Sequence, residues 1–239
     1  MKAILYSTVL VALLSITISC DNTPRHIEDT GNASIVKTTD TPEPDPTNDV
    51  EINDLVQQWE SQDRLIWQKP DMIIGMIDDI QTKTVADIGA GTGYFSFRMA
   101  SKARKVIAVD ISEQMVAYMD SLKYEQLSVS KLDRFEARYV EPHDSGLKQE
   151  EADAVLIVNT YIYIENRIDY FQRLREKLTH KAQLFIVDYK SEDIPIGPAP
   201  GMKMSPVEIT EELVRAGYTI RQVDEASLEY QYIIIAEKV

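Results

Sequence analysis

Three glycines stand in a short turn between an apolar segment and an amphipathic one. The turn consists of Gly89, Ala90, Gly91, Thr92 and Gly93. A strand that enters a glycine-rich turn and continues into a helix is a common nucleotide-binding arrangement in α/β proteins. The dinucleotide pattern Gly-x-Gly-x-x-Gly requires a third glycine where this chain has Tyr94. The sequence therefore argues against a nicotinamide dehydrogenase.

Two carboxylates flank the turn in positions that suit a cationic nucleoside. Asp87 lies just before the turn, and Asp110 ends the next apolar segment, 17 residues after Gly93. Glycines let the backbone approach a bound molecule closely, and the Asp87 carboxylate can organise a cationic group directly or through water. The two oxygens of Asp110 can accept hydrogen bonds from both hydroxyls of a ribose.

The combination of Asp87 with Gly-x-Gly-x-Gly resembles the first motif of the class I S-adenosylmethionine-dependent methyltransferases. Residues 63–239 resemble the small-molecule type of that family. The resemblance implies S-adenosylmethionine as cofactor and a small molecule as methyl acceptor. The predicted cofactor site comprises Asp87, Gly89, Ala90, Gly91, Gly93, Asp110, Ile111, Glu141 and Asn159.

Two further roles follow from the resemblance. The segment after the fourth strand, Asn159-Thr160-Tyr161, is expected to line the methyl-transfer site. An acidic residue after the third strand is expected to contact the adenine amine, and both Glu141 and Asp144 are candidates for it.

Methyl transfer mainly requires that the enzyme align the acceptor, because the methyl group is already activated on a sulfonium. A base is needed only where the acceptor must lose a proton. We predict Tyr161 and Tyr163 as catalytic residues, clustered with Asp188 at the carboxyl ends of the fourth and fifth strands. Tyrosine faces can favour a sulfonium through cation–π contact. The alternative for either tyrosine is that it only packs against the following helix.

A metal centre is not predicted. His143, Asp144 and His180 share no recognisable ligand spacing. Cys20 is the only cysteine, which excludes an internal disulfide and a cysteine-rich metal site.

The segments that must position these residues alternate between strand-like and helical patterns. Strands are predicted at 84–88, 105–110, 134–140, 152–159, 183–190, 218–223 and 230–237. Helices are predicted over 50–80 with a break at Pro70, after the glycine turn, after Ser112, over 166–178 and over 206–216. The short connection between the last two strands indicates antiparallel pairing. We predict an α/β fold with a Rossmann-like, doubly wound, mostly parallel seven-stranded sheet and an antiparallel C-terminal hairpin strand.

Several apolar residues of the first helical region are expected to be buried. They are Leu55, Trp59, Leu65, Ile66, Ile73, Ile74 and Ile77. Trp67, close to Pro70, is assigned either to a lid formed by these helices or to the core.

The N-terminus reads as an export signal. Lys2 precedes a mostly apolar run of 16 residues over 3–18, which is short for a membrane span and suits a signal-peptide core. Ser19 followed by Cys20 resembles a bacterial lipoprotein lipobox, in which the cysteine is lipidated and becomes the mature N-terminus. An uncleaved anchor or an ordinary signal peptide is the alternative. We predict a signal peptide over 1–19, a lipidated cysteine and disordered tether over 20–49, and the methyltransferase domain over 50–239.

Charge and location bear on the partners. The formal net charge of −14 makes nucleic acid an unfavourable substrate, because an acidic surface repels phosphates. The predicted lipid on Cys20 places the domain in a bacterial cell envelope, facing the periplasm or the outside, unless the signal is not used and the protein stays cytoplasmic. Because S-adenosylmethionine is made in the cytoplasm, a lipid-anchored binding or scaffold protein that keeps the fold without catalysis is the competing hypothesis.

Overall fold

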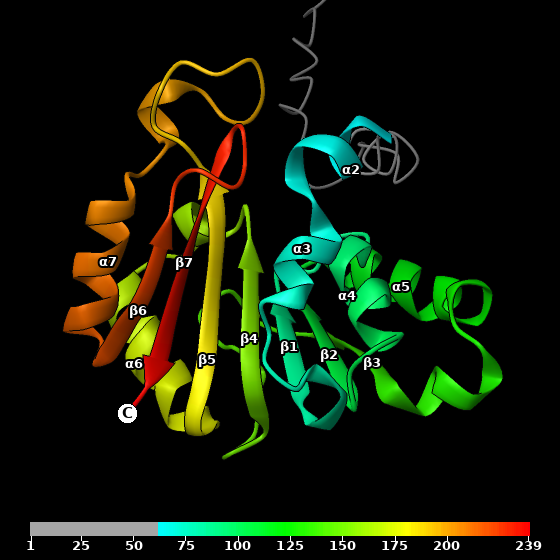
Figure 1. Cartoon of the computed structure of the whole chain (residues 1–239). Helices are drawn as coiled ribbons and strands as arrows, with labels where there is room; N and C mark the ends of the chain where they lie inside the picture. The colour runs from blue at the N-terminus through cyan, green and yellow to red at the C-terminus, as the bar shows by residue number, and fades with distance from the viewer. Residues whose placement is uncertain (1–61) are drawn as a thin grey trace, which may run out of the picture. The chain divides into compact units, whose positions relative to one another are not determined.

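A computed structural model describes residues 62–239, and in this part of the chain seven strands form a single sheet (Figure 1). The strands are β1 (Thr84–Ile88), β2 (Lys105–Asp110), β3 (Phe135–Tyr139), β4 (Ala152–Val158), β5 (Leu178–Tyr189), β6 (Tyr218–Asp224) and β7 (Gln231–Lys238). The predicted signal peptide and tether, and the positions Leu55 and Trp59, lie outside the described residues.

The strand order is β3-β2-β1-β4-β5-β7-β6. Strands β1 to β5 run parallel, and β7 runs antiparallel to both of its neighbours. The predicted fold class is confirmed, including the reversed strand of the C-terminal hairpin. The chain changes direction across the sheet between β1 and β4, and such a switch point is where open α/β sheets bind ligands.

Helices cover both faces of the sheet. They are α2 (Gln62–Gln68), α3 (Pro70–Gly75), α4 (Tyr94–Ala100), α5 (Glu113–Gln126), α6 (Arg167–Lys177) and α7 (Pro206–Arg215). Short 3-10 turns are η1 (Ile80–Thr82), η2 (Val129–Arg134), η3 (Tyr161–Tyr163) and η4 (Pro200–Met202). Alternate strand residues feed two apolar clusters, one packed on α3 and α4 together with the buried Met119 of α5, and one packed on α6 and α7.

Local sequence signals set several helix ends. The Ser112 hydroxyl accepts a hydrogen bond from the Met115 N–H and begins α5, as predicted. Ser205 and Glu208 form a capping box that begins α7, and Gly217 follows that helix with φ +91°. The predicted break at Pro70 is present, because Lys69 takes a left-handed conformation between α2 and α3.

The structure corrects the predicted burial of Leu65 and Ile66. Their relative exposures are 48% and 74%, because α2 directs the neighbouring Gln68 inward instead. The predicted burial of Ile73, Ile74 and Ile77 is confirmed.

The strand whose boundary differs most from its prediction is β5. Strand β5 begins at Leu178, five residues before its predicted start, so this buried leucine belongs to the strand and not to the helix before it.

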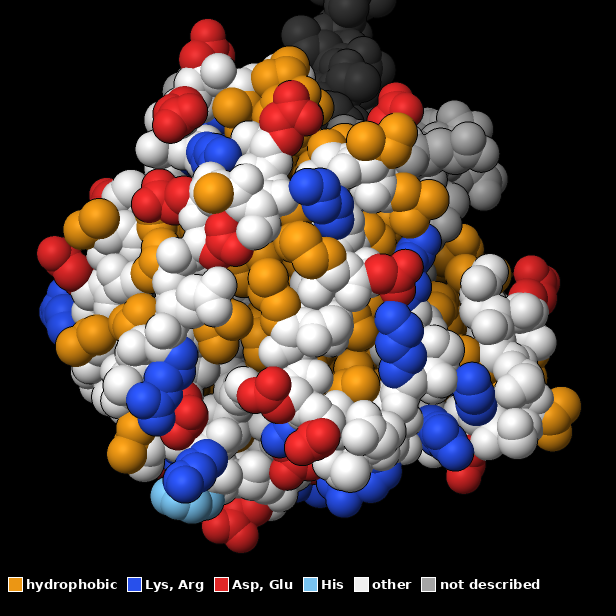
Figure 2. Space-filling view, viewed as in Figure 1, with side chains coloured by type: hydrophobic (Ala, Val, Ile, Leu, Met, Phe, Trp, Pro, Cys, Tyr) orange, Lys and Arg blue, Asp and Glu red, His pale blue; other side chains and the backbone are white. Residues whose placement is uncertain are grey.

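The surface carries charges of both signs. Figure 2 shows acidic and basic side chains interspersed over the face of the molecule that is seen in Figure 1. No helix within residues 62–239 is long and apolar enough to cross a membrane.

Candidate active site

The glycine turn wraps over the carboxyl ends of β1 and β2. Gly89, Gly91 and Gly93 have φ values of +76°, +56° and +85°, in the left-handed region that side chains disfavour. The backbone N–H groups of Gly89 and Ala90 both donate to the Val109 carbonyl, at 2.8 and 3.0 Å. The turn is thereby fixed to the end of β2, where Asp110 follows.

Gly89 also brings the turn against the segment that follows β4. A Cβ atom at this position would lie 2.3 Å from the Thr160 hydroxyl oxygen. That hydroxyl donates to the Val158 carbonyl at 3.0 Å. Asn159 has φ +57°, and its N–H donates to the Val187 carbonyl at 2.9 Å. The predicted residues of the turn and of the Asn159 segment are therefore brought together.

Asp110 is held by backbone donors on both of its oxygens. Oδ2 accepts a hydrogen bond from the Gly91 N–H at 2.7 Å, and Oδ1 accepts one from the Ser112 N–H at 2.9 Å. Burial raises the pKa of Asp110, and the backbone hydrogen bonds oppose this rise. Because a carboxylate oxygen accepts more than one hydrogen bond, both oxygens retain capacity for ribose hydroxyls.

Asp87 is a second buried carboxyl on the side of the sheet that α4 covers. Its Oδ2 accepts a hydrogen bond from the Ser96 hydroxyl at 2.6 Å. Burial raises the pKa of Asp87 to about 6, the Ser96 hydrogen bond opposes the rise, and the charge of Asp110 adds to it. A cation bound beside Asp87 would favour its ionised form.

Helix α2 brings a guanidinium to this end of the site. Arg64 places its guanidinium carbon 4.1 Å from the centre of the Tyr94 ring, and its Nε donates to Gln68 Oε1 at 2.5 Å. Burial lowers the pKa of Arg64, while the charge of Asp87 raises it. The charges of Arg64 and Asp87 favour each other's ionised forms, as smaller influences than burial.

A relay of buried amides connects α2 to the sheet. Gln68 Nε2 donates to Gln231 Oε1 at 2.9 Å, and Gln231 Nε2 donates to Asn159 Oδ1 at 2.5 Å. The Asn159 Nδ2 atom lies 3.4 Å from the Tyr189 hydroxyl. Sequence reasoning missed this relay, because 163 residues separate the two fully buried glutamines and no motif marks either one.

Aromatic contacts complete the docking of α2. The Trp67 ring lies 6.3 Å from the rings of both Tyr189 and Tyr230, which stand at the tips of β5 and β7. Lys69 Nζ donates to the Ser227 carbonyl at 2.8 Å. Of the two roles assigned to Trp67, these contacts favour the lid.

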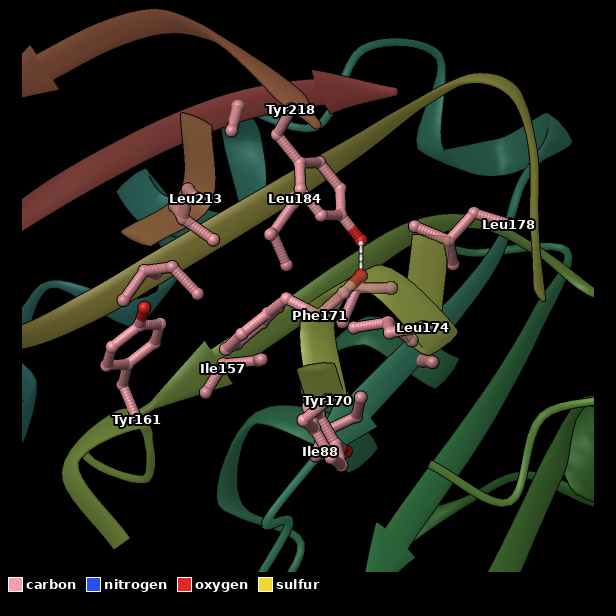
Figure 3. Close-up of a cluster of buried hydrophobic side chains, with 14 of the residues drawn as sticks. Ile88, Ile157, Tyr161, Tyr170, Phe171, Leu174, Leu178, Leu184, Leu213 and Tyr218 are labelled. Carbon is pink, nitrogen blue, oxygen red and sulfur yellow. Dashed lines mark hydrogen bonds between the residues drawn. The ribbon is translucent and has the colours of Figure 1, made fainter. Parts of the chain in front are cut away.

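Tyr161 belongs to the core under α6 and α7 (Figure 3). Its side chain has no exposed surface, its ring stacks on Phe171 at 5.0 Å, and its hydroxyl donates to Glu212 at 2.8 Å. Arg167 donates to the same Glu212 oxygen at 2.7 Å. Burial raises the pKa of Tyr161 well above its usual range. The arrangement matches the packing alternative and gives the predicted catalytic role no support.

Tyr163 and Asp188 occupy opposite environments. Tyr163 is 62% exposed, so the structure does not gather it into one cluster with Tyr161. Asp188 is 2% exposed near the end of β5. Burial raises the pKa of Asp188 to about 6.

The candidates for the adenine contact lie beyond β3. The Val140 N–H donates to the Asp110 carbonyl at 3.1 Å, which brings the chain just before Glu141 to the end of β2. Glu141 is exposed and accepts a hydrogen bond from the Tyr139 hydroxyl at 3.3 Å. Asp144 accepts the Gly146 N–H at 2.9 Å within its own loop. Both assignments, like that of the exposed Ile111, stay predictions.

Within the described part of the chain, no group of three or more His, Cys, Asp and Glu side chains is arranged to hold a metal ion.

Comparison with known proteins adds a family and a set of folds. Residues 85–189 match a family described as a methyltransferase domain. No curated protein matches the chain. A S-adenosylmethionine-dependent methyltransferase from Aquifex aeolicus is similar with a TM-score of 0.71 and 22% identity, over 80% of this chain and 100% of that one.

Two further solved structures share the fold. A S-adenosylmethionine-dependent methyltransferase from Mesorhizobium loti has a TM-score of 0.57 and 15% identity, over 70% of this chain and 96% of that one. The magnesium protoporphyrin IX methyltransferase of Synechocystis, with bound SAH, has a TM-score of 0.59 and 17% identity, over 73% and 84%. At these identities the structures establish the fold, and the domain match over 85–189 confirms the predicted methyltransferase enzyme and its cofactor, S-adenosylmethionine.

Proposed function

We propose that the chain transfers a methyl group from S-adenosylmethionine to a small molecule at the carboxyl edge of the sheet. The observation that carries the proposal is the hydrogen bond from the Gly91 N–H to Asp110, which fixes a ribose-binding carboxylate to the turn. When bound, the cofactor supplies an activated methyl group on a sulfonium. Asp110 would hold its ribose, and Asp87 would balance its ammonium.

The other end of the cofactor carries a carboxylate, and Arg64 provides a matching charge. A guanidinium is suited to carboxylate recognition, and this one lies over the Tyr94 ring, close enough to Asp87 for their charges to interact. An ammonium and a carboxylate on one carbon would therefore meet an acid and a base side by side. This arrangement supports binding of the methionine portion of the cofactor near Arg64 and Asp87.

The acceptor is inferred to be small because the polar side chains of the site are buried. Gln68 of α2 and Gln231 of β7 are fully buried against each other, and Asp87 and Asp110 are nearly fully buried. A site enclosed to this degree favours a small molecule over a protein or nucleic acid chain.

Titration calorimetry of the full chain with S-adenosylmethionine tests the cofactor site. We expect binding by the wild type and its loss in Gly91→Arg and Asp110→Ala. Gly75→Arg is the matched control, because Gly75 has open space around it. Absence of binding by the wild type, or binding that survives both site variants, would overturn the proposal.

Turnover separates the enzyme from the competing scaffold. A scaffold that keeps the site would bind S-adenosylmethionine without producing S-adenosylhomocysteine when small-molecule acceptors are supplied. Formation of S-adenosylhomocysteine that is lost in Asp110→Ala favours the enzyme.

For the N-terminus we propose lipidation of Cys20 and attachment to a membrane of the bacterial cell envelope. The support is the sequence alone: an apolar run of signal-peptide length followed by the lone cysteine. Mass spectrometry of the mature protein is expected to show Cys20 as a lipidated first residue. A cytoplasmic protein with an unmodified Cys20 would contradict this proposal and leave the methyltransferase proposal unaffected.

A further inference from the structure

Asp188 is a buried carboxyl that the cofactor site does not use. It pairs with Tyr232 of β7, and its neighbour Val187 pairs with Val158 of β4. The N–H of Asn159, in the methyl-transfer segment, donates to the Val187 carbonyl. Asp188 therefore lies near the end of β5, next to the point where Asn159 follows the end of β4.

One oxygen of this carboxyl has no hydrogen-bond partner among the described residues. Oδ1 accepts the N–H of the next residue, Tyr189, at 2.8 Å, whereas Oδ2 is buried and accepts nothing. A buried oxygen without a hydrogen-bond donor lowers the free energy of unfolding by about 1–3 kcal/mol. Such groups are rare in native proteins, so a functional explanation is sought for this one.

Two tyrosine hydroxyls on the α6–α7 side of the sheet donate to other groups. The Tyr232 hydroxyl, from the residue paired with Asp188, donates to the Met204 carbonyl at 2.9 Å. The Tyr161 hydroxyl, in the same apolar cluster as Tyr232, donates to Glu212. Neither hydroxyl donates to Oδ2, which leaves this oxygen available to a bound molecule.

The cofactor is an unsuitable donor, because the acids assigned to it are on the other side of the sheet. Asp87 bonds to Ser96 of α4 on the α3–α5 side. In β5, Phe185 and Val187 face that same side, whereas Leu184 and Ile186 face the other side, under α6 and α7. Because side chains alternate along a strand, Asp188 shares the α6–α7 side with Leu184 and Ile186. Oδ2 is therefore left for the second substrate.

We propose that Asp188 Oδ2 accepts a hydrogen bond and then the proton from the methyl acceptor, which is a small molecule bearing an N–H or O–H group at the atom that is methylated. This inference rests on the proposed function. The acceptor nitrogen or oxygen forms a bond to the methyl carbon, the bond from that carbon to the sulfonium breaks with its electron pair going to sulfur, and the acceptor proton passes to Oδ2. The resulting neutral carboxylic acid returns the proton to solvent. The raised pKa of Asp188 suits a group that takes up a proton near neutral pH.

Residues 191–205, which connect β5 to α7, contact two residues next to Asp188 in the sheet. Met204 receives the Tyr232 hydrogen bond, and Gly197 lies so close to the Tyr189 ring that a Cβ there would meet it at 2.8 Å. The proposal therefore requires this segment to move aside before an acceptor can reach Oδ2.

The test compares Asp188→Asn with Asp169→Asn in the full chain. Asp169 is exposed on α6, so Asp169→Asn is a matched control that also removes one carboxylate. Without any substrate, Asp188→Asn is expected to raise the midpoint of thermal unfolding near pH 8, because a buried charge is removed. Both variants are expected to bind S-adenosylmethionine as the wild type does. A lower midpoint in Asp188→Asn would show a structural role and overturn the inference.

Turnover is measured with S-adenosylmethionine carrying a deuterated methyl group and a small-molecule extract of the host cells as the probe. In the product, we expect a labelled methyl group in place of one hydrogen of the acceptor. Formation of this product is expected to be slowed roughly a hundredfold or more in Asp188→Asn and to be unchanged in Asp169→Asn. A product with a permanent positive charge, or an unchanged rate in Asp188→Asn, would overturn the inference while wild-type turnover upholds the proposed function. Absence of wild-type turnover despite cofactor binding would overturn both.

Discussion

The side-chain amide of Gln231 donates to the side-chain oxygen of Asn159 at 2.5 Å, which ties the first residue of β7 to the end of β4. Gln68 continues the connection to α2. The residue expected to line the methyl-transfer site is thus oriented by a helix that lies outside the domain match of residues 85–189.

Gln231→Leu is expected to weaken both the fold and the cofactor site. The substitution leaves the Gln68 amide without its acceptor and the Asn159 oxygen without its donor. With two buried polar groups unsatisfied, the free energy of unfolding is expected to fall by about 2–4 kcal/mol. Urea denaturation measures this, and calorimetry is expected to show weaker binding of S-adenosylmethionine because α2 is less firmly docked.

Gln114→Leu is the control for that experiment, since Gln114 is an exposed amide on α5. Its effect is expected to stay within about 0.5 kcal/mol. Equal losses in both variants would contradict a specific role for the relay.

Binding of S-adenosylmethionine is expected to weaken as the pH falls through about 6. Burial raises the pKa of Asp87 to about 6, so below that pH the carboxyl is largely neutral in the free protein. A neutral Asp87 no longer balances the ammonium, and the cofactor must then bind together with loss of a proton. Calorimetry from about pH 8 to about pH 5 is expected to show up to a tenfold loss of affinity per pH unit below the pKa.

In Asp87→Asn the affinity is expected to be low and nearly independent of pH over the same interval. A wild-type affinity that stays constant to pH 5 would show that Asp87 does not contact the cationic end of the cofactor.

The same pKa values predict how the stability of the free protein changes with pH. Asp87 and Asp188 both have pKa values near 6 in the folded chain, against an ordinary value of 3.8. A raised folded-state pKa means that the contribution to stability is complete below about pH 4 and is lost as the pH rises through about 6. Each carboxyl accounts for on the order of 3 kcal/mol. Urea denaturation at both ends of this interval measures the difference, and Asp188→Asn is expected to reduce it by about half.

Gly89→Ala is expected to destabilise the turn for two separable reasons. A side chain at φ +76° costs about 1–3 kcal/mol. Overlap of the new Cβ with Thr160, 2.3 Å away, costs a further amount of about 1–3 kcal/mol. In a Thr160→Gly background only the first cost remains, so a double-mutant cycle in urea isolates the overlap. Gly75→Ala, in open space on α3, is expected to be neutral or slightly stabilising.

How much the sequence could predict depended on how local the determining contacts are. The glycine turn, Asp87 and Asp110 belong to one strand–turn–helix unit and the strand that follows it, so their spacing alone carries the family resemblance that implies the cofactor, while the alternation of strand-like and helical segments predicts the fold. The Ser112 cap and the break at Pro70 are local in the same sense. Gln68 and Gln231 meet only because β7 is inserted beside β5, and no short-range pattern reports such an insertion.

Burial was harder to predict where a helix docks by few contacts. Leu65 and Ile66 are apolar, yet α2 turns them outward and buries Gln68, since its inward face meets another amide and not an apolar sheet. The role of Tyr161 could not be assigned from its position either. Tyr161 follows β4, where a methyl-transfer residue is expected. Its hydroxyl instead donates to Glu212 on α7, 51 residues later in the chain.

Tyr161→Phe separates packing from catalysis at that position. Loss of the hydrogen bond to Glu212 is expected to lower the free energy of unfolding by about 1–2 kcal/mol and to leave the rate of S-adenosylhomocysteine formation within about threefold. Tyr218→Phe is the matched control, because its buried hydroxyl donates to the Phe171 carbonyl at 3.2 Å far from the carboxyl edge (Figure 3). Similar small effects on rate in both variants support a core role for Tyr161. A loss of roughly a hundredfold in Tyr161→Phe alone, with cofactor affinity unchanged, would instead restore the catalytic role, because a proton-transfer group contributes at that scale and a packing hydroxyl does not.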